Sequence, residues 1–193
     1  LTHAIESYTC IKHTPVTDLY CLDAIKRIFK YLPVAVKDGT DKVARENMSI
    51  AAYEAGVAIN TSPTTIVHGM SRPIGAVFHV PHGISNAMLL VECLRAVLPG
   101  AYSRFAELAV LVGAAQDGEE PAIASEKFLE KLEEFTKSLN VPTLREYGLD
   151  LQKFAQKEEK MASDSVASGS PANCYKVLSK EEQIAVYEIL RNK

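Results

Sequence analysis

Hydrophobic residues recur every three or four positions along most of the chain, which is the spacing of one face of an α-helix. Residues 16–36 show this pattern until Pro33 disturbs it, so we expect a helix that ends there. The alternation of apolar and polar residues that marks a half-buried strand is almost never sustained. The pattern therefore predicts a single all-α domain of about eight or nine helices that spans residues 1–193.

Capping and turn-forming residues divide the chain into these helices. Thr40 or Asp41 can cap one helix, and Ser179 with Glu182 forms a capping box at the start of another. The helices other than 16–36 are expected at residues 1–10, 43–55, 84–98, 102–115, 122–139, 149–161 and 180–190. Residues 68–83 and 162–177 are predicted to be loops, because both combine glycine and proline with small residues.

Charge and hydropathy exclude some classes of function. The 193 residues carry a net charge of -3, and acidic and basic residues are interspersed, so we expect no nucleic-acid partner. The apolar stretches fall short of the roughly 20 residues that a membrane-spanning helix needs. Residues 1–3 also lack the features of a signal peptide. We therefore expect a cytoplasmic protein that does not enter a membrane.

The four cysteines are far apart, and no two of them form a C-x-x-C pair. This spacing suggests neither a disulfide framework nor a thiolate zinc site. We expect buried free thiols.

The segment HGMSRPIGAVFHVPHG, residues 68–83, holds three of the five histidines. Neutral imidazoles bind zinc and ferrous iron. His82 stands between a proline and a glycine where a helix is expected to begin, so the backbone holds it in place, as suits a metal ligand. His68 can face it across a turn, and His79 is close enough in sequence to face the same ion. Spacing alone leaves metal binding and a structural role equally open, and His13 is expected to be structural or exposed.

Sequence position suggests no carboxylate directly beside these histidines. Glu54 and Asp164 are candidates for orienting the ligands, although a solvated or capping role is as good an interpretation of each. The chain contains no G-x-G-x-x-G turn and no P-loop, so it does not itself hold a dinucleotide's phosphates. Two other functions stay open: a metal-dependent hydrolase, although H-E-x-x-H is missing, and a non-catalytic helical interaction module.

Two segments, LTHAIESYTC at 1–10 and AGVAINTSPTTIVHGMSRPIGAVFHVPHGISNAMLL at 55–90, resemble the C-terminal domain of the iron-containing, group III alcohol dehydrogenases. The resemblance spans essentially the whole chain. It implies the all-α metal-binding domain of the dehydroquinate synthase-like fold, which faces an N-terminal nucleotide-binding α/β domain across the active site. It further implies Fe²⁺, or Zn²⁺, held by an aspartate and three histidines, here His3, His68 and His82.

The family's aspartate would fall two positions before Leu1, so this chain would be the metal-binding domain without its nucleotide-binding partner, and inactive alone. The resemblance implies an NAD(P)-dependent alcohol dehydrogenase in which the metal acts as a Lewis acid on a small alcohol or aldehyde. An exposed apolar cleft face suggests a homo-oligomer, such as a dimer.

Three further positions follow from the same resemblance. Arg72 stands where the family commonly has a histidine that helps to orient or move a proton, which an arginine cannot do at neutral pH. Its guanidinium suits an anionic group on the substrate, such as a carboxylate, or else a carboxylate of the protein. His79 would line the cleft or cap the loop. Asn60 and Thr61 would lie near the nicotinamide of the cofactor or cap a helix.

Overall fold

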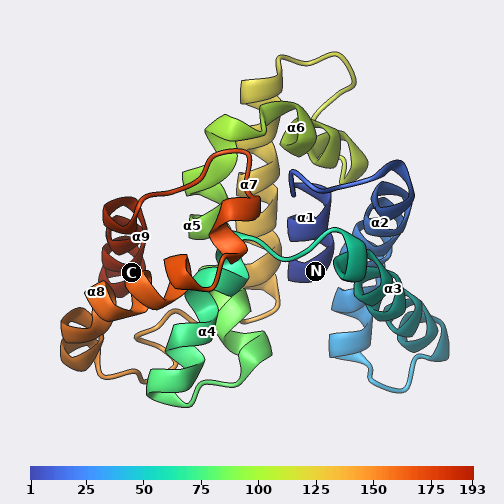
Figure 1. Ribbon diagram of the computed structural model, residues 1–193. Helices are drawn as coiled ribbons and strands as arrows, with labels where there is room; N and C mark the ends of the chain where they lie inside the picture. The colour runs from blue at the N-terminus through green and yellow to red at the C-terminus, as the bar shows by residue number, and fades with distance from the viewer.

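The computed structural model describes residues 1–193, and its regular structure consists of helices alone (Figure 1). The prediction of an all-α fold with eight or nine helices is therefore confirmed. The nine α-helices are α1 (Thr2–Tyr8), α2 (Pro15–Lys37), α3 (Lys42–Thr61), α4 (Ile66–Phe78), α5 (His82–Val97), α6 (Tyr102–Leu111), α7 (Pro121–Ser138), α8 (Leu151–Ala167) and α9 (Lys180–Asn192). Two 3₁₀ turns, η1 (Leu98–Gly100) and η2 (Ser170–Asn173), follow α5 and α8.

The segment 68–83 is not the loop that its glycines and prolines predict. Residues up to Phe78 belong to α4, which contains Pro73, and only the three residues before His82 form a turn. The reason is burial: Ile66, Met70 and Ile74 recur at helical spacing and are fully buried. Their packing outweighs the backbone hydrogen bond that Pro73 cannot make. His79 ends α4 in a left-handed conformation with φ of 56°.

Two other helix ends differ from expectation. Pro33 lies inside α2, which continues to Lys37, so one missing N–H does not stop the helix. Helix α8 extends to Ala167 because Phe154, Met161 and Ser165 continue one buried face beyond the predicted end. The predicted capping box of Ser179 and Glu182 at the start of α9 is confirmed.

The short helix α1 lies at the centre of the arrangement, between the α2–α3 hairpin on one side and α4 and α5 on the other (Figure 1). Its residues from Ala4 to Tyr8 are all buried. Ser7 and Ser62 exchange two hydrogen bonds, in which each hydroxyl donates to the other's carbonyl oxygen at 2.8 and 2.6 Å. These bonds fix the end of α1 against the end of α3.

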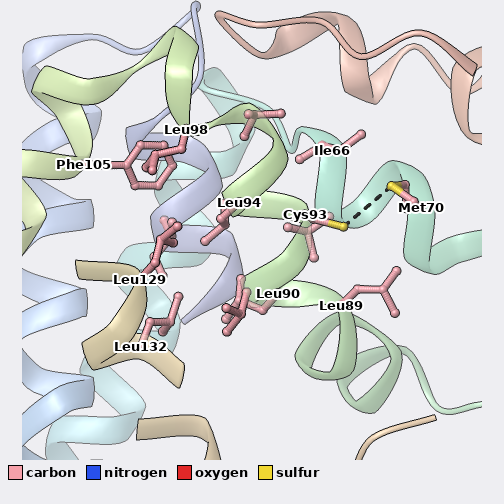
Figure 2. Close-up of a cluster of buried hydrophobic side chains, with 14 of the residues drawn as sticks. Ile66, Met70, Leu89, Leu90, Cys93, Leu94, Leu98, Phe105, Leu129 and Leu132 are labelled. Atoms are coloured by element: carbon pink, nitrogen blue, oxygen red, sulfur yellow. Dashed lines mark hydrogen bonds between the residues drawn. The ribbon is translucent and has the colours of Figure 1, made fainter. Parts of the chain in front are cut away.

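A single hydrophobic core joins the helices, and α5 runs through it. Figure 2 shows Leu90 and Leu94 of α5 facing Leu129 and Leu132 of α7. On the other side Cys93 contacts Met70 of α4, with the two sulfur atoms 3.7 Å apart. All four cysteines are free and buried, as predicted. No helix is both long and apolar enough to cross a membrane.

Helix α4 packs tightly on η2 at Gly69. A Cβ atom at Gly69 would lie 2.8 Å from Cγ of Pro171 and 3.0 Å from the hydroxyl of Ser165, which is closer than packed atoms approach. Gly69→Ala should therefore lower the free energy of unfolding by about 1–3 kcal/mol, as overpacked core sites do.

Gly56, inside α3, supplies the matched control, because a Cβ atom there would meet no atom within 4 Å. Gly56→Ala should raise the free energy of unfolding by about 0.5–1 kcal/mol, since alanine favours the helix. Urea unfolding of both variants measures the two changes. Shifts of the same sign would contradict the close packing of Gly69 against Pro171.

Candidate metal centre

Three histidines from three helices meet at one place: His3 of α1, His68 of α4 and His82 of α5. One ring nitrogen from each lies within 4.8 Å of the other two. The rings of His3 and His68 are stacked with their centroids 4.7 Å apart, and the rings of His68 and His82 are 5.0 Å apart. The fold therefore brings together the three residues to which the sequence resemblance assigned the metal.

Each of these histidines lies in the first turn of its helix. For His82 the sequence explains the position, because Pro81 precedes the helix and fixes the backbone that enters it. The position of His68 follows from the burial of the apolar face of α4. The position of His3 follows from the docking of α1 in the core. All three imidazole side chains are thus attached to helical backbone rather than to loops.

The cluster is buried on one side and open on the other. His68 is only 2% exposed, His3 is half-buried and His82 is exposed. Burial, and then the neighbouring His68 ring, lower the pKa of His3 to about 4. Burial, His68 and Arg72 also lower the pKa of His82 below its ordinary value. Both imidazoles are therefore neutral at neutral pH, which is the form that binds a metal.

The buried carboxylate of Glu6, on α1, forms a close hydrogen bond with Nδ1 of His68. Which nitrogen of the ring carries the proton decides which of the two atoms donates. The side-chain amide nitrogen of Asn86 lies 3.2 Å from Nε2 of His68 and 3.1 Å from Nε2 of His82. The Nε2 atoms of His68 and His82 thus face the same buried amide.

The carboxylates proposed from the sequence do not reach this cluster. Glu54 lies in the α2–α3 hairpin, 3.8 Å from Nε of Arg27. Asp164 is exposed on α8 and pairs with Lys160 of the same helix at 2.6 Å. The ligand-orienting interpretation was therefore wrong for both residues, and the solvated alternative describes Asp164.

Sequence reasoning missed Glu6 and Asn86. A signal was present for each: Glu6 follows His3 by three positions and Asn86 follows His82 by four, and residues at these spacings share one face of a helix. Ser71 donates a close hydrogen bond to the amide oxygen of Asn86 and so orients the amide.

Arg72 lies on α4 close to the cluster and is exposed. Its guanidinium donates to the hydroxyl of Ser170 at 3.0 Å and to that of Thr64 at 3.4 Å. No carboxylate of these 193 residues forms an ion pair with Arg72. Its charge is held in place by neutral hydroxyl groups.

The remaining predicted residues lie outside the histidine cluster. His79 is exposed at the end of α4, where its backbone ends the helix. Asn60 and Thr61 are the last two residues of α3 and are exposed, and the Asn60 amide donates to the carbonyl of Gly56 at 2.9 Å. His13 lies 3.0 Å from a carboxylate oxygen of Asp18, which fits the structural role expected for it.

The side chains in the cluster fit a divalent metal such as Fe²⁺ or Zn²⁺. They offer neutral imidazole nitrogens at convergent positions, and a carboxylate orients one of the rings from behind. Histidines that bind metals in proteins commonly donate their second nitrogen to such a carboxylate. Three protein ligands also leave positions for other groups, as catalytic metal sites require.

Comparison with known proteins identifies the family of the chain. A family model described as "Fe-containing alcohol dehydrogenase family, C-terminal" matches residues 1–191. The chain is 39% identical over 143 residues to the NAD-dependent methanol dehydrogenase of Bacillus methanolicus. The aligned region covers 74% of this chain and 38% of that protein. It is 34% identical over 189 residues to alcohol dehydrogenase 4 of Saccharomyces cerevisiae. That aligned region covers 96% of this chain and 47% of the yeast protein.

The crystal structure of a 1,3-propanediol oxidoreductase superposes on this chain with a TM-score of 0.92 at 29% identity, over 98% of this chain and 49% of that one. The chain thus spans less than half the length of these relatives. The comparisons do not favour a hydrolase or a non-catalytic module. The chain belongs to the iron-containing alcohol dehydrogenase family and corresponds to the C-terminal part of its members.

Proposed function

We propose that this chain is the metal-binding half of an NAD(P)-linked alcohol dehydrogenase that interconverts a small alcohol and its aldehyde or ketone. The observation that carries the proposal is the convergence of His3, His68 and His82 at a site that is open on one side. The family to which the chain belongs supports an oxidoreductase rather than another use of three imidazoles.

His3, His68 and His82 would hold the metal, Fe²⁺ or Zn²⁺, through one nitrogen each. A divalent metal at this site supplies a Lewis acid for the substrate oxygen. The three imidazoles are suited to bind this metal, because the lowered pKa values keep His3 and His82 neutral and Glu6 orients the His68 ring.

The nicotinamide cofactor would be held by a second domain that covers the exposed side of the cluster. The length of the relatives supports this, since the chain matches only 47% of alcohol dehydrogenase 4 and 49% of the solved propanediol oxidoreductase. The exposed end of α3, with Asn60 and Thr61, is the part of this chain that we assign to the nicotinamide end of the cofactor. His79, exposed beside the start of α5, is assigned to the lining of the cleft.

Arg72 would bind an anionic group on the substrate, such as the carboxylate of a hydroxy acid or a semialdehyde. Two observations support this assignment: its guanidinium is held by hydroxyl groups and has no carboxylate partner within this chain, and its charge lowers the pKa of His82. An arginine presents several donors in one plane, which matches the two oxygens of a carboxylate.

The metal site can be tested on the 193-residue chain. The purified chain should bind one equivalent of Zn²⁺ or Fe²⁺, and His82→Ala should lose stoichiometric binding, because it removes one of three ligands. His13→Ala is the matched control, since His13 pairs with Asp18 and lies outside the cluster. Metal analysis and calorimetric titration measure both. Equal binding by the wild-type and His82→Ala chains would refute the site.

The 193-residue chain alone should show no NAD(P)H-linked turnover of alcohols or aldehydes, even with metal bound, because it contains no motif that holds a dinucleotide. The measurement is the change of NADH or NADPH absorbance with the metal-loaded chain. Turnover by this polypeptide alone would refute the proposal that a second domain holds the nicotinamide cofactor.

The role of Arg72 can be tested in an enzyme that joins this chain to a nucleotide-binding domain. Arg72→Ala should lower kcat/KM for a carboxylate-bearing aldehyde about 10- to 100-fold, the effect of one charge-assisted hydrogen-bonded contact, and leave an uncharged aldehyde of the same length nearly unaffected. Arg145→Ala, an exposed arginine between α7 and α8, is the control. An equal loss for both aldehydes would refute anion recognition by Arg72.

A further inference from the structure

Glu6 is completely buried, and the five groups around it can all donate a hydrogen bond. One oxygen, Oε1, accepts from the backbone N–H groups of Thr65, Val67 and His68 at 3.1, 2.7 and 3.2 Å, and from the Thr65 hydroxyl at 2.9 Å. The other oxygen, Oε2, faces Nδ1 of His68. A carboxylate offers only acceptor positions, so it matches this set of partners completely.

Through Oε1, Glu6 acts as the cap of a helix to which it does not belong. Helix α4 begins at Ile66, and the residue before it, Thr65, makes no side-chain cap of its own. The N–H groups of Val67 and His68 are those that an N-cap side chain normally satisfies. A carboxylate at this end also interacts favourably with the helix dipole. Glu6 therefore fixes the first turn of α4, including the backbone of His68, from α1.

Through Oε2, the same carboxylate selects the tautomer of His68. A neutral imidazole carries its proton on either Nδ1 or Nε2. With the proton on Nε2, the Nδ1 lone pair would face a carboxylate oxygen in a place without water, which is strongly unfavourable. With the proton on Nδ1, the ring donates to Glu6 and the Nε2 lone pair faces the cluster.

The geometry points to Glu6 as the positioning residue of the metal site: its carboxylate holds His68 in the Nδ1–H tautomer and so leaves Nε2 without a proton, in the form that binds a divalent cation. This inference rests on the metal-binding role proposed above. Because Glu6 and His3 lie on the same face of α1, the docking of one short helix both supplies one ligand and sets the tautomer of another.

The test is Glu6→Gln in the 193-residue chain. Glutamine has the same shape but only one acceptor oxygen, and the four donors at the Oε1 position should hold that oxygen there. Its NH₂ group then faces Nδ1 of His68 and donates to it, which moves the ring proton to Nε2. We expect the affinity for Zn²⁺ to fall about 10- to 100-fold, as it does when such supporting groups are removed from metal sites.

Two measurements separate positioning from mere support of the fold. The ¹⁵N chemical shifts of the His68 ring in the metal-free chain report which nitrogen carries the proton, and calorimetry reports the Zn²⁺ affinity. Thr65→Val is the matched control, because it removes one donor to Oε1 but leaves Oε2 against the ring. It should lower thermal stability and change neither the tautomer nor the affinity beyond about 2-fold, within the uncertainty of such comparisons.

The inference is overturned if the wild-type metal-free chain holds His68 in the Nε2–H form, a result that does not depend on whether any variant folds. It is also overturned if Glu6→Gln folds and keeps both the Nδ1–H tautomer and the wild-type Zn²⁺ affinity. Failure of the proposed function looks different: the wild-type chain would then bind Zn²⁺ no better than His82→Ala, whatever the tautomer of His68.

Discussion

The buried carboxylate of Glu6 is the constraint on which the rest of the site depends. A carboxylate without solvent is strongly destabilising unless hydrogen bonds replace its hydration, and here five donors do so. All five belong to residues 65–68 at the start of α4, so they hold α1 against the end of that helix. Once α1 is fixed in this way, the stacking of His3 on His68 follows without any further interaction between the two rings.

The site lies at the N-terminal ends of three helices, which is an unusual place to gather a cation. Helix N-termini carry partial positive charge, and this disfavours both protonated histidines and metal ions. The lowered pKa values of His3 and His82 are in accord with that environment, although burial is their largest cause. Glu6 offsets the charge at one of the three ends, at the residue that is most buried. The open side of the cluster lies at His82 and Arg72, which are both exposed.

Much of this structure could be predicted from the sequence because it depends on local chemistry. The helical periodicity predicts the fold, the capping box of Ser179 and Glu182 marks the start of α9, and Pro81 with Gly83 marks His82 as the first residue of a helix. The errors came where packing decides. Pro73 and the glycines of α4 indicate a loop, but the burial of Ile66, Met70 and Ile74 keeps the segment helical. The spacing of Glu6 from His3 indicates a shared helix face, but only the tertiary docking of α1 brings Glu6 to His68.

The turn from His79 to Pro81 is short, so His68 and His82 come together as soon as two neighbouring helices pair, whereas His3 must be brought in from the far end of the chain. Closing that long loop is entropically expensive and is completed only when α1 is inserted into the core. A ligand bound by all three rings would therefore bind the native fold and no partly folded state. Its binding free energy would add directly to the free energy that separates the native chain from the unfolded one.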